Sequence, residues 1–322
     1  MNRRLFVTAL AAALAAPSLA LAQAYPSKPI TIIVPFPPGG ATDIVARLMG
    51  QKLSASLKQP VVVDNKAGAT GAIGLSHVAR SAPDGYTLIV ATASSLGTNP
   101  AVSNVPFDPI ADFTPIGLLA AEPMGLAVHP SVPANNVKEL IAYAKANPGK
   151  LNMASFGTGS VSHLAGELFS SMAGIKMVHV PYKGAAPATA DLIGGQVSIM
   201  FNSISVFVAP AKAGKLKLLA SAGAERSRGI LADLPTIAES GVPGFEASTW
   251  HAALGPANLP QDIVTLLSRE LGAALKQPDV QEKLASMSLE PQGATPPQLS
   301  EQLRKDVAKW KKTVAEAGIK VR

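Results

Sequence analysis

The sequence predicts an α/β protein of two lobes, in which each lobe holds a mainly parallel β-sheet flanked by helices and two crossover strands join the lobes. Three observations predict this fold. The chain has 322 residues, of which 48% are hydrophobic, enough to form about two cores. From Ile30 onward, β-branched runs alternate with amphipathic stretches, the pattern of a parallel sheet covered by helices. A second series of the same kind begins after Pro133, which indicates a second lobe.

The first lobe begins with three strands joined by helices. Strands are expected over 30–36, 61–64 and 87–92, where β-branched residues gather, and helices over 43–57 and 74–80, where apolar residues recur with helical spacing. Helical crossovers make these strands parallel. Their carboxyl ends therefore meet at one edge, where open parallel sheets bind ligands.

The second series starts with a capped helix. Asn136, with Glu139 three residues later, is a capping pattern, and Pro148 ends the helix that it begins. The next helix, 160–173, carries an apolar stripe that we expect to be buried, namely Val161, Leu164, Leu168 and Met172. The other expected elements are strands over 151–155, 177–182, 197–201 and 216–221 and a helix over 187–193.

The C-terminal segment is expected to return to the first lobe. Thr295, with Gln298 three residues later, begins a helix. Its apolar residues share one face, which must be buried: Leu299, Leu303, Val307, Trp310 and Val314. Lobe 1 has room for this stripe, so the chain must cross between the lobes twice, near 120–128 and 248–255, and two crossings form a hinge. The predicted limits are 23–124 plus 248–322 for lobe 1 and 125–247 for lobe 2.

The first 22 residues have the composition of a secretory signal peptide. Two arginines precede an apolar run, and Ala20 and Ala22 place small residues at the cleavage positions. A membrane anchor is the alternative, but Pro17 interrupts the run well short of the ~20 apolar residues that a spanning helix needs. We therefore expect cleavage near Ala22 and export to the periplasm.

Composition excludes several classes of function. Cysteine is absent, which rules out disulfides, thiolate metal sites and a cysteine nucleophile. Cleavage of the signal peptide leaves 26 basic against 21 acidic residues, a net charge of +5, which is a mild bias toward anions. Scattered basic residues and 5% aromatic residues argue against nucleic-acid binding. His163 and Glu167 alone show a metal-ligand spacing, which is weak evidence. We expect no metal, no cofactor and no catalytic residue.

Two glycine-rich turns, one in each lobe, join the end of a strand to the start of a helix. Glycine lets the backbone approach a ligand closely, and the free N–H groups of a helix start attract negative charge. Both turns are therefore candidate anion sites. The candidates are Gly39, Gly40, Ala41 and Thr42 in lobe 1, and Ser155, Thr158, Gly159, Ser160 and His163 in lobe 2.

Each turn also has another interpretation. The lobe 1 turn is explained equally by a βα connection capped by Thr42 or Asp43, and His163 by a surface or capping role. The lobe 2 turn resembles a truncated dinucleotide fingerprint, but Ser162 replaces the third glycine and no acid follows the next strand. A secreted α/β enzyme that binds a phosphorylated cofactor through the Gly157–Gly159 turn is therefore the alternative hypothesis.

Further candidates follow other strands at the same edges of the sheets. Thr92 and Ser94 follow the third strand of lobe 1, although an ordinary polar loop explains them as well. A lysine ammonium pairs with carboxylates, although most lysines face solvent. The candidates at the equivalent places in lobe 2 are Tyr182, Lys183, Gly184 and Asn202.

Motifs along nearly the whole chain resemble those of one family. They include Tyr25-Pro26, Val34-Pro35-Phe36-Pro37-Pro38-Gly39-Gly40 with Asp43, Asn65-Lys66, Pro83-Asp84-Gly85-Tyr86, Ser155-Phe156-Gly157-Thr158-Gly159-Ser160 with His163, and Val180-Pro181-Tyr182-Lys183-Gly184. The chain is similar to the substrate-binding receptors of the tripartite tricarboxylate transporter system, the Bug family.

This resemblance implies a periplasmic binding protein of the type II, Venus-flytrap kind. Such a receptor is expected to be a monomer without enzymatic activity that holds one carboxylate of a small organic acid between its lobes and delivers it to membrane transporter subunits. The resemblance implies ligand contacts at the candidates in both turns, at the Thr92–Ser94 loop and at the Tyr182–Gly184 turn. Where many relatives carry Asp, this chain has Asn202, which argues against a ligand with an amine.

Overall fold

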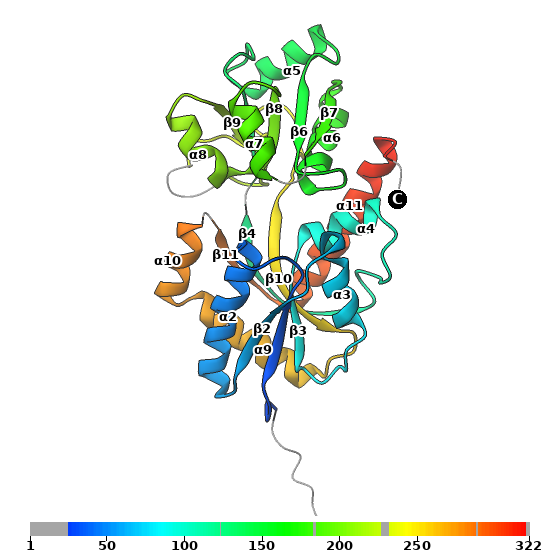
Figure 1. Ribbon diagram of the computed structural model, residues 1–322, viewed down its shortest axis with the longest axis vertical. Helices are drawn as coiled ribbons and strands as arrows, with labels where there is room; N and C mark the ends of the chain where they lie inside the picture. The colour runs from blue at the N-terminus through cyan, green and yellow to red at the C-terminus, as the bar shows by residue number, and fades with distance from the viewer. Residues whose placement is uncertain (1–24, 123, 183–184, 227–231, 288, 320–322) are drawn as a thin grey trace, which may run out of the picture.

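The computed structural model describes residues 25–122, 124–182, 185–226, 232–287 and 289–319. Their strands form two β-sheets that lie one above the other along the long axis, with helices around each (Figure 1). The predicted two-lobed α/β fold is confirmed; lobe 1 contains the six-stranded sheet and lobe 2 the five-stranded sheet. The exact limits of the lobes stay predictions, and the predicted signal peptide, 1–22, lies outside the described residues. None of the described helices is both long and apolar enough to cross a membrane.

The lobe 1 sheet is built around three parallel strands. β1 (Ile30–Val34) lies between β2 (Val61–Asn65) and β3 (Thr87–Thr92) and is parallel to both. Its central position explains its apolar sequence, because such a strand is covered on both faces. The two predicted helices between these strands are α2 (Ala41–Leu57) and α3 (Ala72–Ala79).

Three more strands complete this sheet, in the order β11-β4-β10-β3-β1-β2. They are β4 (Phe113–Glu122), β10 (Thr249–Pro256) and β11 (Glu290–Ala294). β10 is antiparallel to β3 and to β4, and β11 is antiparallel to β4. The chain leaves lobe 1 after β4 and returns along β10, at the two predicted crossings (Figure 1). The sheet is mixed because the returning strand, β10, and the last strand, β11, run against the other four.

The lobe 2 sheet has the order β7-β6-β8-β5-β9. β6 (Asn152–Ser155) is parallel to both β7 (Val178–Pro181) and β8 (Ile199–Ser203). β5 (Met124–Val128), which enters from lobe 1, is antiparallel to β8 and to β9 (Lys217–Ser221). In this sheet the crossover strand β5 alone opposes the others.

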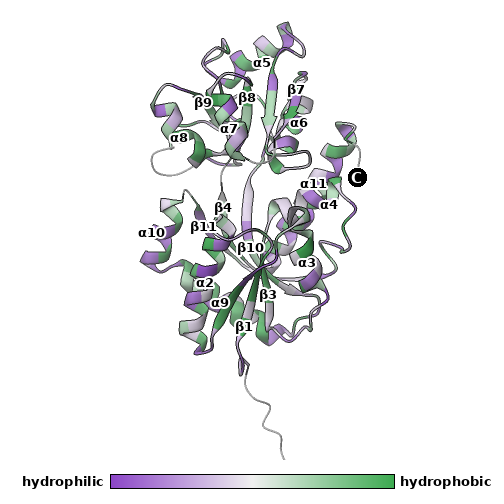
Figure 2. Ribbon diagram, viewed as in Figure 1, coloured by the Kyte–Doolittle hydropathy of each residue, from purple (hydrophilic) through white to green (hydrophobic). Residues whose placement is uncertain are grey.

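Helices cover the sheets of both lobes. Figure 2 shows hydrophobic residues along the strands and polar residues on many outward helix faces, so each sheet lies within a core. In lobe 2 the helices are α5 (Val137–Ala146), α6 (Val161–Ala173), α7 (Ala185–Ile193) and α8 (Ile204–Lys212). Lobe 1 adds η1 (Ala69–Gly71), η2 (Ser94–Thr98), α4 (Asn99–Val102), α9 (Gln261–Leu275) and α10 (Pro278–Ser286).

The buried face of α6 differs from the predicted stripe at its C-terminal end. Met172 is 41% exposed, whereas Phe169 is fully buried. The Phe169 ring lies 5.7 Å from that of Phe201 on β8 and 5.9 Å from that of Phe245. Contacts among these aromatic rings decide which face of the helix is buried. Residues buried as predicted are Val161 and Leu164.

The C-terminal helix, α11 (Pro296–Glu316), begins at the predicted capping box between Thr295 and Gln298. All five residues of its predicted stripe are buried. The first three pack in a core of lobe 1, as predicted. Trp310 and Val314 instead pack in the main core of lobe 2. The helix therefore joins both lobes, where the sequence predicted contact with lobe 1 alone.

Candidate functional site

The loops that follow β1, β2 and β3 lie together at one edge of the lobe 1 sheet. The Asn99 side chain donates to Ala69 O at 3.1 Å and so links α4 to η1. A Cβ atom added at Gly71 would lie 2.8 Å from Ser95 Cβ and 3.3 Å from Pro35 Cβ. Gly71 therefore allows the other two loops to approach closely. The three loops form one surface beside the start of α2.

The start of α2 is open. Its N-cap is Gly40, which provides no side-chain cap, so the first backbone N–H groups of this helix keep their capacity to bind an anion. Among the described residues, no atom would contact a Cβ added at Gly39 or Gly40. Of the other two candidates in this turn, Ala41 is partly exposed and Thr42 is buried.

Asp43 orders the turn before α2 rather than capping the helix. Its Oδ2 accepts a hydrogen bond from Gly39 N at 3.0 Å and one from Arg47 Nε at 2.9 Å. Its Oδ1 accepts from Asn65 Nδ2 at 2.9 Å. Bonding to Arg47, to Gly39 and to Asn65 lowers the pKa of Asp43 to about 2, against the effect of its burial. The carboxylate therefore stays charged and fixes the turn to the end of β2.

The loop that follows β3 contains two candidate residues with hydroxyl groups, Thr92 and Ser94. Thr92 is buried, and its backbone N and Oγ1 both lie within hydrogen-bond distance of Ser95 Oγ, at 3.0 and 3.3 Å. It therefore shapes the turn at the end of β3. Ser94 is partly exposed, which leaves its side chain better placed than Thr92 to contact a ligand.

Most of the hydrogen bonds of the candidate turn of lobe 2 are made within the turn itself and with the start of α6. Gly157 N donates to Ser155 Oγ at 3.2 Å. Ser160 is the N-cap of α6; its Oγ accepts from His163 N at 3.3 Å and donates to Gly157 O at 2.7 Å. Thr158 is exposed at the tip of the turn. The start of α6 is therefore capped, whereas that of α2 is not.

His163 supports this turn from within the helix. It is buried, and its Nδ1 accepts from Gly159 N at 3.1 Å. Its Nε2 faces Glu167 Oε1 at 3.5 Å. The ring stacks on His179 of β7, with centroids 3.8 Å apart and planes 19° from parallel. Both ring nitrogens of His163 have protein partners, so it positions the turn and has no nitrogen left for a ligand.

His179 is a residue of the site that the sequence did not indicate. Its Nε2 lies 2.7 Å from Ser155 Oγ, and burial together with the neighbouring His163 lowers the pKa of His179 to about 4. The β6–β7 register pairs Met153 with His179, so His179 and Ser155 project from the same face. Strand order is needed to see this contact, and no local signal gives it.

Gly159 lies where the two lobes meet. It is buried with φ +81°, and a Cβ atom added there would lie 2.4 Å from Cγ2 of Val102 in α4. Val102 itself belongs to the core cluster of lobe 2. The loop edges of the two sheets therefore face each other and touch at this point, a contact that the sequence did not indicate.

The remaining lobe 2 candidates differ in their surroundings. Tyr182 Oη donates to Asp191 Oδ2 at 2.7 Å, and burial together with this bond raises the pKa of Tyr182 to about 12. Asn202 is buried and donates from Nδ2 to Thr189 Oγ1 at 3.2 Å. Lys183 and Gly184 lie outside the described residues.

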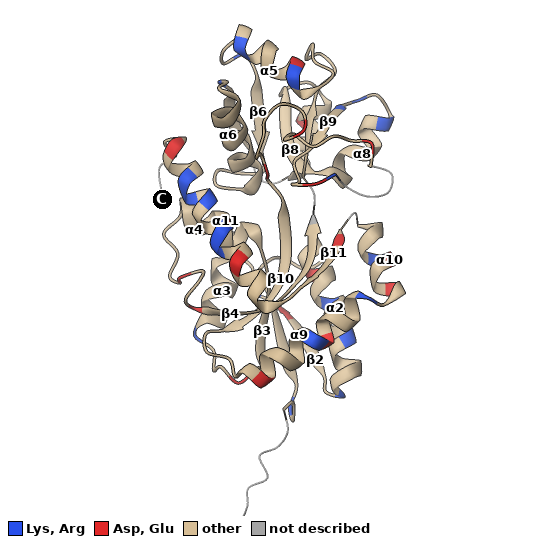
Figure 3. Ribbon diagram, turned by 180° about the vertical axis from the view of Figure 1, so that it is seen from behind, with Lys and Arg blue, Asp and Glu red and all other residues tan. Residues whose placement is uncertain are grey.

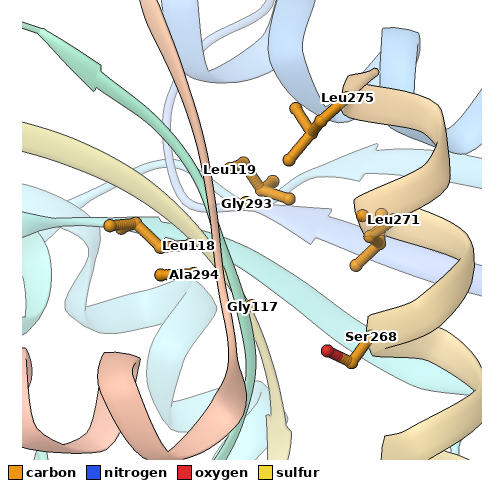
Figure 4. Close-up of a pocket in the computed structure, with 9 residues that line it drawn as sticks. Gly117, Leu118, Leu119, Ser268, Leu271, Leu275, Gly293 and Ala294 are labelled. Atoms are coloured by element: carbon orange, nitrogen blue, oxygen red, sulfur yellow. The ribbon is translucent and has the colours of Figure 1, made fainter. Parts of the chain in front are cut away.

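A small pocket away from these loops lies between β4, β11 and α9 (Figure 4). Its walls are mainly apolar, with Leu119, Leu271 and Leu275 around Gly117 and Gly293, and contain none of the predicted site residues. Organic ligands need convergent polar groups for orientation. We therefore assign the candidate site to the facing loop edges of the two sheets.

The chemistry available at these edges is that of anion binding. Charged residues lie mainly on helices and connecting loops (Figure 3), and within the described part of the chain no three His, Asp or Glu residues are arranged to hold a metal ion. The edges offer backbone N–H groups, hydroxyls and an uncapped helix start. A two-lobed α/β chain with such groups where its lobes meet is built like a solute-binding receptor.

Comparison with known proteins identifies the family. Residues 45–319 match the tripartite tricarboxylate transporter family receptor, TctC. The chain belongs to this family of receptors, as its motifs predict.

Solved structures agree with this assignment. Rpa4515 of R. palustris, solved with adipate, is 37% identical and has a TM-score of 0.77; the match covers 91% of this chain and 98% of that one. MatC of Rhodopseudomonas palustris, solved with bound malate, is 33% identical over 90% of this chain and 100% of its own, with a TM-score of 0.74. The periplasmic binding protein BugD is 37% identical, with coverages of 92% and 99% and a TM-score of 0.74.

Proposed function

We propose that this protein is a periplasmic receptor that binds a small organic carboxylate between its lobes and delivers it to membrane subunits of a tripartite tricarboxylate-type transporter. The uncapped start of α2 carries the proposal. It presents free N–H groups at the positive end of a 17-residue helix dipole, and open space surrounds Gly39 and Gly40. A carboxylate fits this position because it accepts several hydrogen bonds at once.

Side chains from both lobes complete the proposed site. Ser94 is partly exposed and Thr158 is exposed at the facing edges. Tyr182 follows β7, and Asn202 lies near the end of β8, with β6 between these two strands. Asn202 is neutral and already bonded to Thr189, which supports a ligand without an amine. Adipate and malate, the ligands of the two solved relatives, are the probes of choice.

The alternative of a cofactor-dependent enzyme receives less support from the geometry. A phosphate at the Gly157–Gly159 turn would need free N–H groups there. The N–H groups of both glycines already bond to Ser155 and His163. The family and the similar periplasmic binding protein BugD support receptor function in the periplasm, as does the predicted signal peptide. We propose that the receptor acts as a monomer.

A matched pair of variants tests the proposed helix start. In Gly40→Asp, the new carboxylate occupies the N-cap and bonds the N–H groups that the ligand needs. We expect this variant to lose binding of adipate and malate while the free energy of unfolding stays equal or rises by a few tenths of a kcal/mol. Gly40→Ala is the control, because Gly40 has φ −80° and ψ 170°, which alanine adopts, and open space around it.

Thermal shift and calorimetry give the readouts. A ligand at 100 times its dissociation constant stabilises the native state by ~2.7 kcal/mol, which raises the melting temperature by several degrees. The corresponding diamides, at constant ionic strength, should give no shift. Binding of the diamides as tightly as the acids, or normal binding by Gly40→Asp, would refute carboxylate recognition at this helix. Gly159→Val is a poorer test, because the added side chain would strike Val102.

A further inference from the structure

His163, His179 and Glu167 form a compact group beneath the lobe 2 turn. We propose that His179 and Glu167 are positioning residues that act through His163, and that His163 holds the turn for ligand binding only while its ring is neutral. This inference rests on the proposed function, since the turn is taken to contact the ligand. It assigns a role to two residues outside the predicted site and makes ligand affinity depend on pH.

The hydrogen bond from Gly159 fixes the state of His163. A ring nitrogen accepts a backbone N–H bond only through its lone pair, so the 3.1 Å bond from Gly159 N requires Nδ1 without a proton. In the neutral ring the proton then lies on Nε2, which faces Glu167 Oε1 at 3.5 Å. A second proton would convert Nδ1 into a donor opposite another donor. Protonation of His163 therefore breaks the hydrogen bond that holds Gly159 in place.

His179 holds the other end of the turn. Its Nε2 lies 2.7 Å from Ser155 Oγ, which in turn accepts from Gly157 N and donates to Gly157 O. The two rings stack at 3.8 Å, so a charge on one opposes a charge on the other. Burial and His163 keep the pKa of His179 low, while Glu167 acts in the opposite direction.

The groups around the His163 and His179 rings determine how readily the rings bind a proton. His179 comes from β7 and Glu167 from α6 itself, and β6 contributes the hydroxyl of Ser155. The other elements packed on α6 contribute apolar side chains to the same core, among them Phe201 of β8, Trp310 and Val314 of α11 and Val102 of α4. Glu167 raises the pKa of His179 and His163 lowers it, so we take Glu167 as the anion that favours a proton on the ring pair.

This arrangement predicts opposite effects for two substitutions. His179→Gln keeps an amide that can bond Ser155 but removes the neighbouring ring, so His163 should take up its proton at higher pH than in the wild type. Glu167→Gln removes the anion, so His163 should take up its proton at lower pH. Damage to the fold alone would not raise the midpoint of the His163 titration in one variant and lower it in the other.

Ring and amide resonances of ¹⁵N-labelled, ligand-free protein provide the first measurement. In a pH titration, we expect the Gly159 amide resonance to move with the same midpoint as the His163 ring, and this common midpoint to rise in His179→Gln and fall in Glu167→Gln. His77→Gln, an exposed position in lobe 1, is the control and should leave the midpoint unchanged. A Gly159 amide that does not follow His163, or variants that shift the midpoint in the same direction, would overturn the proposal.

Calorimetry with adipate and malate provides the second measurement. Affinity should fall about tenfold for each pH unit below the His163 midpoint, because binding then requires loss of one proton, and this decline should move with the midpoint in the two variants. Affinity that stays constant through the midpoint would overturn the link to binding. If neither acid binds at any pH, the proposed function is contradicted, and the amide titration still decides whether the rings hold the turn.

Discussion

Asp43 places a buried negative charge in the first turn of the helix that we propose to bind an anion. Its side chain is 5% exposed and paired with Arg47, so the charge is compensated within the protein. The bond from Gly39 N shows what the carboxylate does there. It holds the turn before α2 in the shape that leaves the following N–H groups open.

The variant Asp43→Asn tests whether the Asp43 carboxylate holds this turn, because the free energy of unfolding and its dependence on pH should both change. Loss of charge-assisted bonds inside a buried network should lower the free energy of unfolding by about 1–3 kcal/mol at pH 7. Because the pKa of Asp43 is lowered to about 2, the wild type should lose this contribution as the pH falls from about 4 to 2, and the variant should not. Urea unfolding at several pH values measures both. Asp279→Asn, at a carboxylate 64% exposed and paired with Lys52, should change stability by under about 0.5 kcal/mol.

His251 should lower the stability of the native state at acidic pH. It is buried on β10, and burial lowers its pKa to about 4. In the unfolded chain His251 binds a proton below about pH 6.5. In the native state it binds that proton only below about pH 4, so protonation favours the unfolded chain between these two values. Native stability should therefore fall by about 2 kcal/mol from this residue as the pH drops from 7 to 5.

Matched leucine substitutions isolate that contribution. His251→Leu should flatten the pH dependence of the free energy of unfolding between pH 4 and 6.5, whereas His77→Leu, at an exposed position, should leave it unchanged. Chemical unfolding across this range gives both slopes. An equal slope in wild type and His251→Leu would show that His251 titrates normally.

At the level of helices and strands, local signals in the sequence were sufficient for most of the fold. Asn136 Oδ1 accepts from Glu139 N at 2.9 Å, and Thr295 closes its capping box with Gln298, because caps depend on neighbours in sequence. The buried end of α6 was not predictable in this way. Helical spacing allows either Phe169 or Met172 to face inward, and the aromatic residues of other elements decide between them.

The candidate site was predictable only in part for the same reason. The Gly39–Thr42 and Ser155–Ser160 segments stand where strands meet helices, which alternation in the sequence reveals. The local sequence pattern does not show that the start of α2 is uncapped and the start of α6 is capped. The capped start of α6 and the stacking of His163 on His179 require the packing of α6 against β7, and the packing of Gly159 against Val102 requires the arrangement of the lobes.

Trp310 tests whether α11 joins the lobes. It is fully buried in the lobe 2 core although its helix begins in the lobe 1 core. Trp310→Ala should lower the free energy of unfolding by about 3–5 kcal/mol, because it removes a large buried side chain. Lys312→Ala, on the exposed face of the same helix, should have an effect within about 0.5 kcal/mol. Urea unfolding of both variants compares them, and near-wild-type stability of Trp310→Ala would contradict a structural link through this helix.

For the whole molecule, the packing of α11 determines how the lobes can move. Two crossing strands alone would permit closure about a hinge between them. α11 and α4 add contacts with the core of lobe 2 on one side of the molecule, while α8 and α10 lie on the opposite side in both ribbon views (Figures 1 and 3). The side that contains α11 should stay together, and the lobes should open and close on the side of α8 and α10.

Distances between paired spin labels test this asymmetry, and the absence of cysteine lets each pair be introduced without removing a native thiol. Lys212→Cys with Lys283→Cys places one exposed label on α8 and one on α10, and Asn104→Cys with Ser171→Cys places labels beside α4 and on α6. On addition of saturating adipate, the first pair should approach, and the second should keep its distance, because α11 and α4 hold that side in one packed core. Small-angle scattering on the same samples should show a smaller radius of gyration with adipate. Equal shortening of both pairs would mean that α11 slides with the closure, and two unchanged distances with adipate bound would mean that the lobes are closed before the ligand arrives.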